Sequence, residues 1–395
     1  MNPLRSRLPI FVVALLAACT TMGPRIVPPQ LEPIPEPAPV IALEPEAPRY
    51  PLPVATHRFE IDADDDVVGE VQVTFVGQND TLSDIARRFD VGYEEIVRAN
   101  PGVDPWVPRV GSEVVVPTQF ILPAAERKGI VVNVAEMRIF YFPPAKAGQR
   151  QVVYTHPIGI GRVGWSTPEG TTKVVSKVKD PVWRPTASIR AEHKKNGDPL
   201  PAVVPAGPDN PLGNRKFTLG WPSYLIHGTN KPYGVGLRSS HGCLRLYPED
   251  VEKLFDMVAV GTQVTVVNQP FVFGWHRDDL YLQAFDVLEG DTRDWSKSQP
   301  KLLAKTLTKR VQTELAARKE AVSWAKVAEL AKAPRGLPVL VSAGGEDVAA
   351  VIAAAQRVQN QIPEGANWDG ADDQARQEQQ DVQGMVVEQL RAPRS

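Results

Sequence analysis

The chain has 395 residues, of which 43% are hydrophobic, so it is long enough for two or three domains with ordinary cores. Its 44 basic and 46 acidic residues give a net charge of -2, and this balance argues against nucleic acid as a partner. Its 38 prolines exceed the roughly 5% of an average protein and indicate a segment that cannot bury a core.

The first residues are typical of a secretory signal. Arg5 and Arg7 precede an apolar run at 8–18 that is too short to span a membrane as a helix. Residues 16–19, Leu-Ala-Ala-Cys, resemble the lipobox of bacterial lipoproteins, so we expect cleavage of the signal peptide 1–18 and lipidation of Cys19. The alternative is an ordinary cleaved signal that contains a cysteine. If Cys19 carries lipid, Cys243 has no disulfide partner and is expected to do chemistry.

Residues 19–66 are predicted to be the lipidated cysteine and a Pro-rich tether. Prolines recur from Pro24 to Pro53, which favours extended polyproline II structure. Thr20 follows Cys19, and no aspartate stands there to retain a lipoprotein in the inner membrane. We therefore expect a periplasmic protein whose lipid lies in the inner leaflet of the outer membrane.

Residues 67–120 form a separate unit with a helix-capping motif, in which Thr81 is followed three positions later by Asp84. The pattern predicts a strand at 71–76, a helix from Thr81, a second helix at 93–99 and a strand at 114–116. The segments DTLSDIA, IVRANP and VVVP resemble the LysM module. The resemblance implies binding of glycans that contain N-acetylglucosamine; a small structural domain that has lost binding is the alternative.

Residues 127–268 contain short β-rich runs between glycines and prolines, which predict an all-β sandwich or barrel. The runs lie at 130–134, 137–142, 151–158, 171–178, 224–227 and 264–267. One helix is predicted at 248–258 with Pro248 in its first position. Tyr247 is a poor N-cap, so this helix is expected to depend on packing for its start.

Residues 269–345 are predicted to be a C-terminal extension, a strand followed by helices. Apolar side chains recur there at helical spacing: Leu302, Leu303, Leu307, Val311 and Leu315. Residues 346–395 are polar and are predicted to be a partly disordered tail.

The chemistry is expected where an apolar strand ends at His227 and a glycine-containing connection leads to Ser-His-Gly-Cys at 240–243. The connection can bend to bring Cys243 beside His227. A thiolate is the nucleophilic form of cysteine, and an imidazole can accept the thiol proton near neutral pH. Gly242 leaves the neighbouring backbone amides uncovered, which suits an oxyanion hole for acyl transfer.

These motifs resemble the L,D-transpeptidase (YkuD) catalytic domain, in particular its ErfK/YbiS/YcfS/YnhG branch. The resemblance implies that Cys243 is the nucleophile and His227 the proton acceptor and donor, with the Gly228 carbonyl orienting His227. It gives His241 a supporting role, with direct acid-base duty as the alternative.

Candidate substrate-binding residues follow from the same resemblance. Arg245 stands where many relatives outside the branch have Asn; it can bind a stem-peptide carboxylate or pair with an acidic neighbour such as Glu249. Tyr233 is a further candidate. Trp183 and Arg190 lie in segments that resemble the long loops near the branch's active-site groove, and packing or a surface ion pair is their alternative role.

The implied reaction has two steps and no cofactor. Cys243 attacks the bond between diaminopimelate and D-Ala in a peptidoglycan tetrapeptide stem, releases D-Ala, and passes the acyl group to an amine. In this branch the acceptor is a lysine of an envelope lipoprotein; an outer-membrane protein, crosslinking of two diaminopimelates, or hydrolysis are the alternatives. A carbapenem is expected to acylate Cys243.

Two other classes of function stay open from the sequence. His227, His241 and Cys243 are possible zinc ligands, which would make the protein a metal enzyme. A non-catalytic peptidoglycan-binding lipoprotein that uses only its LysM module is the other.

Overall fold

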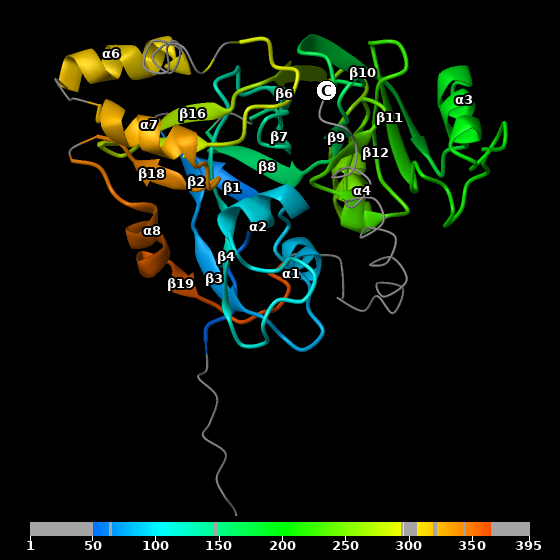
Figure 1. Cartoon of the computed structure of the whole chain (residues 1–395). Coiled ribbons are helices and arrows are strands. Elements are labelled where there is room, and N and C mark those ends of the chain that lie inside the picture. The colour runs from blue at the N-terminus through cyan, green and yellow to red at the C-terminus, as the bar shows by residue number, and fades with distance from the viewer. Residues whose placement is uncertain are drawn as a thin grey trace, which may run out of the picture. The chain divides into compact units, whose positions relative to one another are not determined.

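The computed structural model describes residues 50–62, 65–145, 148–293, 295, 306–318, 322–342 and 344–364 (Figure 1). The predicted signal, Cys19 and most of the tether lie outside this range. The strands are β1 (Arg58–Ile61), β2 (Val67–Gly69), β3 (Gln72–Phe75), β4 (Glu113–Val116), β5 (Gln119–Ile121), β6 (Gly129–Asn133), β7 (Arg138–Phe142), β8 (Gln151–Pro157), β9 (Ile160–Gly161), β10 (Gly170–Lys179), β11 (Arg215–Leu219), β12 (Leu225–His227), β13 (Arg238–Ser240), β14 (Leu244–Arg245), β15 (Gln263–Val267), β16 (Phe271–His276), β17 (Asp279–Ala284), β18 (Pro338–Leu340) and β19 (Gln356–Arg357). The helices are α1 (Leu82–Arg88), α2 (Tyr93–Ala99), α3 (Ala187–Lys195), α4 (Pro248–Met257), α6 (Lys309–Arg318), α7 (Trp324–Lys332), α8 (Val348–Ala354) and the short 3-10 helix η1 (Pro232–Gly234).

The LysM-like unit has the predicted order of strand, helix, helix and strand, as β3, α1, α2 and β4. The expected capping box is present: Thr81 Oγ1 accepts from the Asp84 N–H at 3.2 Å, and the Thr81 N–H donates to Asp84 Oδ2 at 2.8 Å. Strands β3 and β4 pair antiparallel, and the apolar faces of both helices pack on them. The local sequence signals therefore sufficed for these four elements.

The catalytic region is built on a nine-stranded sheet in the order β1-β8-β7-β6-β15-β10-β11-β12-β14. The first half of β10 pairs with β15 and the second half with β11, with a register shift between Val174 and Ser176. Such an irregularity lets a strand bend and pass from one half of a sheet to the other. The expected mainly-β fold is confirmed: nine described strands form one continuous sheet around this bend, and β9 and β13 form a separate two-stranded sheet.

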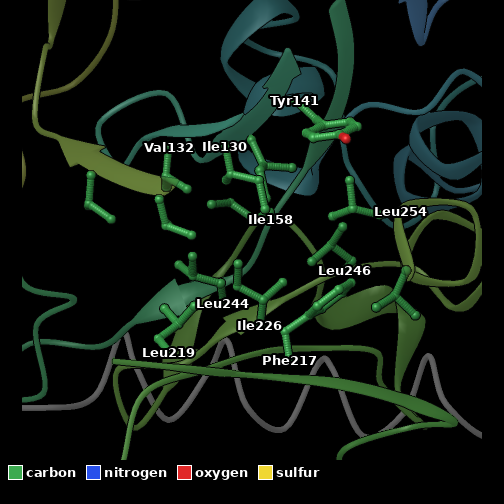
Figure 2. Close-up of a cluster of buried hydrophobic side chains, with 14 of the residues drawn as sticks. Ile130, Val132, Tyr141, Ile158, Phe217, Leu219, Ile226, Leu244, Leu246 and Leu254 are labelled. Carbon is green, nitrogen blue, oxygen red and sulfur yellow. The ribbon is translucent and has the colours of Figure 1, made fainter. Parts of the chain in front are cut away.

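Buried side chains from both halves of the sheet share one core. Ile130 and Val132 from β6 lie opposite Phe217 from β11 and Ile226 from β12, as Figure 2 shows. Leu254 of α4 belongs to the same cluster. This core fixes the positions of the two strands that flank the catalytic segment.

The C-terminal region departs most from expectation. Strands β16 and β17 pair with each other, and β17 also pairs with β18, which follows helices α6 and α7. Within 346–395, predicted to be a partly disordered tail, α8 and β19 are formed; residues beyond 364 lie outside the described range. Strand β19 extends the LysM sheet by pairing in parallel with β3, a long-range partner that no local signal reveals.

A buried ion pair joins the LysM unit to the catalytic sheet. Glu95 of α2 accepts from Arg138 of β7 at 2.8 Å and 3.1 Å, and the two side chains are 5% and 0% exposed. The Arg138 guanidinium also lies over the Phe120 ring, 4.1 Å from its centroid. Because both charges are removed from water, each is stabilised mainly by the other. The pair therefore stabilises the contact between the two units only while both residues are present.

A second junction holds the start of α4. Arg87 of α1 donates to both carboxylate oxygens of Glu249, at 2.9 Å and 3.1 Å. The Tyr247 hydroxyl donates to the Val91 carbonyl at 3.1 Å, whereas the Tyr247 side chain makes no capping bond. Helix α4 therefore starts by packing against the LysM unit, as the poor N-cap predicted.

The N-terminus of α2 contacts the connection that leads from His227 to Cys243. The N–H groups of Tyr93 and Glu94 donate to the carbonyls of Val235 and Gly236, both at 3.2 Å. Gly236 has φ +81°, and a Cβ there would lie 2.3 Å from the Tyr93 nitrogen, so only glycine fits. The LysM unit thus supports a segment of the predicted active site.

Replacing Glu95 with Ala should lower the free energy of unfolding by about 3–5 kcal/mol, because it leaves the Arg138 guanidinium buried without its carboxylate. Urea unfolding measures this. Glu60→Ala is the matched control, since Glu60 pairs with Arg58 at the surface with 52% of its side chain exposed, and its loss should cost about 1 kcal/mol or less. Equal losses of unfolding free energy in the two variants would show that the buried pair contributes no more than a surface ion pair.

Candidate active site

The structure brings the histidine strand and the cysteine segment together. Strand β12, which ends at His227, pairs in parallel with β14, and the register sets Ile226 opposite Leu244 and His227 opposite Arg245. Cys243 directly precedes β14. Because side chains alternate along a strand, Cys243 and Arg245 are expected on the face that also carries His227.

His227 is buried and oriented by its neighbour. Its Nδ1 lies 2.6 Å from the Gly228 carbonyl oxygen, and the side chain is almost fully enclosed. A carbonyl can only accept, so Nδ1 carries the hydrogen and Nε2 keeps its lone pair. Burial, followed by the charge of Arg245, lowers the pKa of His227 to about 3. The imidazole is therefore neutral near pH 7 and can accept a proton at Nε2.

Cys243 is a half-buried thiol. Its Sγ lies 3.7 Å from the Ser223 carbonyl oxygen, a contact in which the thiol donates. Burial raises the pKa of the Cys243 thiol, while the Leu225 N–H and the Arg245 charge oppose that rise. The free site accordingly favours a thiol beside a neutral imidazole.

A tight hydrogen-bonded turn carries the residues before the cysteine. Ser240 Oγ donates to the Cys243 carbonyl at 2.6 Å and accepts from the Gly242 N–H at 3.1 Å. The Gly242 carbonyl accepts from Thr167 Oγ1 at 3.0 Å. Gly242 has φ +99°, and a Cβ there would lie 2.8 Å from the Tyr224 ring, which explains the glycine.

This turn uses one of the amides near the cysteine. The backbone amides around Cys243 were expected to serve an oxyanion hole; the Gly242 N–H donates to Ser240 Oγ, and a role for the other amides stays a prediction. Ser240 and Thr167 had no assigned role from the sequence. Ser240 stands within the Ser-His-Gly-Cys motif, which was the one signal that could have marked it; no local pattern marks Thr167.

His241 lies with a different set of residues from those around His227. Its Nε2 is 3.1 Å from Glu192 Oε2 and 3.1 Å from Arg162 Nη2. The Trp165 ring meets the His241 ring edge-on, with centroids 4.9 Å apart. No pattern in the sequence associates Arg162, Trp165 or Glu192 with the motif.

Arg245 does not pair with Glu249, so that alternative is wrong. Its Nη1 donates to Ser239 Oγ at 3.1 Å, whereas Glu249 binds Arg87. Tyr233 of η1 lies close enough to Arg245 to affect its pKa. Arg245 therefore acts on the electrostatics of His227 and Cys243 from within the site.

Trp183 and Arg190 both lie in the excursion between β10 and β11. The backbone of Trp183 bridges that of Val204, with Trp183 half-buried. Arg190 is exposed on α3. The structure links neither side chain directly to Cys243.

One cluster in the described part of the chain has ligand atoms close enough for a metal ion: Asp90, His156 and Asp250, within 4.8 Å of one another. His227, His241 and Cys243, the zinc set considered from the sequence, do not form such a group. His156 Nδ1 lies 2.9 Å from Asp90 Oδ2 and 3.1 Å from Asp250 Oδ1.

A proton can hold this cluster together without a metal. Burial alone would lower the pKa of His156, but Asp250 and Asp90 outweigh it and raise that pKa to about 10. The neighbouring cavity is also lined by Arg87, Arg88 and Lys253, whose charges repel a further cation. We interpret the cluster as an ion-pair contact between the LysM unit and the catalytic region.

A cavity adjoins the turn at Gly242. Gly161, Ser166, Thr167, Glu169 and Arg238 are among the residues that line it. Thr167 therefore contacts both this cavity and the Gly242 carbonyl.

Comparison with known proteins agrees with the acyl-transfer chemistry expected of this site. Residues 127–266 match the L,D-transpeptidase catalytic domain family, YkuD, and residues 76–117 match the LysM domain family. The chain is 45% identical over 236 residues to the probable L,D-transpeptidase YcfS of Escherichia coli strain K12, covering 58% of this chain and 70% of the relative. It is 40% identical over 299 residues to the probable L,D-transpeptidase ErfK/SrfK of Salmonella typhimurium strain LT2, covering 75% and 91%.

A third relative gives the same result. The probable L,D-transpeptidase YbiS of Escherichia coli strain K12 is 41% identical over 268 residues, which cover 67% of this chain and 83% of the relative. The chain belongs to the L,D-transpeptidase family. It is an L,D-transpeptidase, an acyltransferase of peptidoglycan, with an N-terminal LysM domain.

Alkylation of Cys243 by iodoacetamide should show a pH midpoint above about 8.5, the ordinary value for a thiol. A Cys19→Ser background leaves Cys243 as the one thiol. Arg245→Gln should move the midpoint higher, because the guanidinium charge stabilises the thiolate. Arg58→Gln, at the surface, should leave it unchanged. A midpoint below pH 7, or no change in Arg245→Gln, would contradict this description of the site.

Proposed function

We propose that Cys243 is the nucleophile and His227 the acid-base residue of the acyl transfer that this L,D-transpeptidase carries out on peptidoglycan. The observation that carries the proposal is the parallel β12–β14 pairing, which sets the Cys243 segment beside a neutral His227 held through Nδ1 by Gly228. This arrangement leaves Nε2 as the proton acceptor. The protein binds peptidoglycan through its LysM and transpeptidase domains.

The first half of the reaction forms a thioester. Cys243 Sγ attacks the carbonyl carbon between diaminopimelate and D-Ala, and the thiol proton passes to His227 Nε2. The tetrahedral intermediate collapses as the C–N bond breaks, and His227 returns that proton to the departing amine of D-Ala. The stem, shortened by one residue, stays on Cys243 as a thioester.

The second half reverses the proton movement. An acceptor amine attacks the thioester, loses a proton to His227 Nε2, and forms an amide. The C–S bond breaks, and His227 gives its proton to the leaving thiolate. Because burial lowers the pKa of His227, the imidazole is neutral at rest and the imidazolium exists only during each transfer.

We propose a lysine amine of an envelope lipoprotein as the acceptor, which is what the resemblance to the ErfK/YbiS/YcfS/YnhG branch implies. Crosslinking of two diaminopimelates and hydrolysis use the same thioester and differ only in the second nucleophile. Support for the lysine acceptor is the 40–45% identity to members of this branch.

We further propose that lipid on Cys19 anchors the enzyme to the inner leaflet of the outer membrane and that the Pro-rich segment tethers it there. The support is the Leu-Ala-Ala-Cys motif and the recurring prolines up to Pro53. Among the described residues, no helix is long and apolar enough to cross a membrane.

Cys243→Ala should reduce D-Ala release from a tetrapeptide muropeptide by at least about a thousandfold, because no nucleophile remains. His227→Ala should be nearly as severe, whereas His241→Ala should keep measurable activity. His276→Ala is a control for histidine removal at a distance, since His276 pairs with Asp65. Chromatographic assay of free D-Ala gives the rates. Residual turnover above a few per cent in Cys243→Ala would remove the basis of the proposal.

The acceptor can be identified by mass spectrometry of products formed from muropeptides with and without a purified envelope lipoprotein. The proposal predicts a lipoprotein carrying a tripeptide stem, lost when its lysine amines are acetylated beforehand. Diaminopimelate crosslinks or free tripeptides as the main product in both reactions would instead identify the crosslinking or hydrolytic alternative.

A further inference from the structure

A carboxylate from a distant segment lies against His241, two residues before the nucleophile. Glu192 belongs to α3, inside the excursion between β10 and β11. Its Oε1 pairs with Nη2 of Arg162, a residue that follows β9. Its Oε2 lies 3.1 Å from His241 Nε2. Arg162 and His241 thus converge on one carboxylate that comes from a distant segment of the same region.

Helix α3 is weakly attached to the rest of the catalytic region. None of its side chains is buried, so no hydrophobic face holds it down. The side chains of Arg162, Glu192 and His241 are themselves 35%, 27% and 21% exposed. Ion pairs with this exposure contribute little to stability, which makes Glu192 easy to displace.

The two donors form a suitable site for a carboxylate in general. Arg162 Nη2 also lies 3.1 Å from His241 Nε2, so one oxygen-bearing group can contact both. The hydrogen bond from Arg162, and to a smaller extent the one with His241, lowers the pKa of Glu192. The site therefore favours the ionised carboxylate. Trp165 packs edge-on against the His241 ring and limits its movement.

Arg245, which also lies near Cys243, is less suited to binding a substrate carboxylate. Arg245 Nη1 is bonded to Ser239 Oγ, and its Nε is enclosed within the protein. A substrate carboxylate would have to enter that enclosure to reach it. Arg162 is accessible from solvent and lies on the side of the motif that carries His241.

We propose that Arg162 and His241 form a binding site for a carboxylate of the peptide stem, and that Glu192 occupies this site in the free enzyme as an internal stand-in. This inference rests on the proposed function. A tetrapeptide stem has two carboxylates near the bond that is cut, the terminal one of D-Ala and the side-chain one of diaminopimelate. Binding of either displaces Glu192 and releases α3 from His241.

The experiment compares D-Ala release from three synthetic stems: one with both carboxylates free, one with the D-Ala carboxylate amidated, and one with the diaminopimelate side-chain carboxylate amidated. If amidation of one carboxylate abolishes the effect of the Arg162→Gln substitution on KM, that carboxylate is the one that Arg162 binds. The variants are Arg162→Gln and Glu192→Gln, with Lys194→Gln on the exposed surface of α3 as the matched control.

Arg162→Gln should raise KM for the free stem by about ten- to a hundredfold with little change in kcat, since a charge-assisted contact to the substrate is lost. It should have no such effect on one of the two amidated stems. Glu192→Gln should lower KM for the free stem a few-fold, because a neutral amide competes less well for Arg162. Lys194→Gln should match the wild type.

Two results would overturn the inference while the proposed function stands. One is a rise in KM in Arg162→Gln that is equal for all three stems. The other is a higher KM in Glu192→Gln, which would show that Glu192 serves only to support His241. If the wild-type enzyme releases D-Ala from none of the stems, the proposed function itself fails and this site loses its ligand with it.

Discussion

The parallel pairing of β12 with β14 is the constraint on which the rest of the site depends. Parallel neighbours cannot be joined by a tight turn, so the chain must leave the sheet after His227 and return before Cys243. That connection is supported from outside the sheet by the backbone N–H groups at the start of α2, which donate to Val235 and Gly236. The LysM domain is therefore part of the framework of the catalytic segment as well as a peptidoglycan-binding module.

The electrostatics of the site follow from this geometry. The register sets Arg245 opposite His227, and burial together with that charge keeps the imidazole neutral. Burial also keeps the Cys243 proton in place in the free enzyme. Charge separation then arises only as the substrate carbonyl is attacked, when the protein can stabilise it. Catalysis of this kind depends on interactions that are stronger in the transition state than in the ground state.

Features encoded by neighbouring residues could be predicted from the sequence. The Thr81 capping box, the helix that begins at Pro248 and the Ser-His-Gly-Cys motif all depend on short spacings. Long-range partners could not be predicted in this way. The Glu95–Arg138 pair, the β19–β3 pairing and the contact of Glu192 with His241 join segments whose meeting is decided by tertiary packing. The use of the Gly242 N–H by Ser240 likewise depends on the shape of a turn that composition does not specify.

The central claim is that a peptidoglycan stem becomes covalently attached to Cys243, and trapping that thioester tests it most directly. The full chain is mixed with a tetrapeptide muropeptide in the absence of acceptor, quenched in acid after short times, and examined by intact mass and peptide mapping. The account predicts one adduct, the stem without D-Ala, on the peptide that contains Cys243. Release of D-Ala with no adduct at any time, or an adduct on another residue, would contradict it.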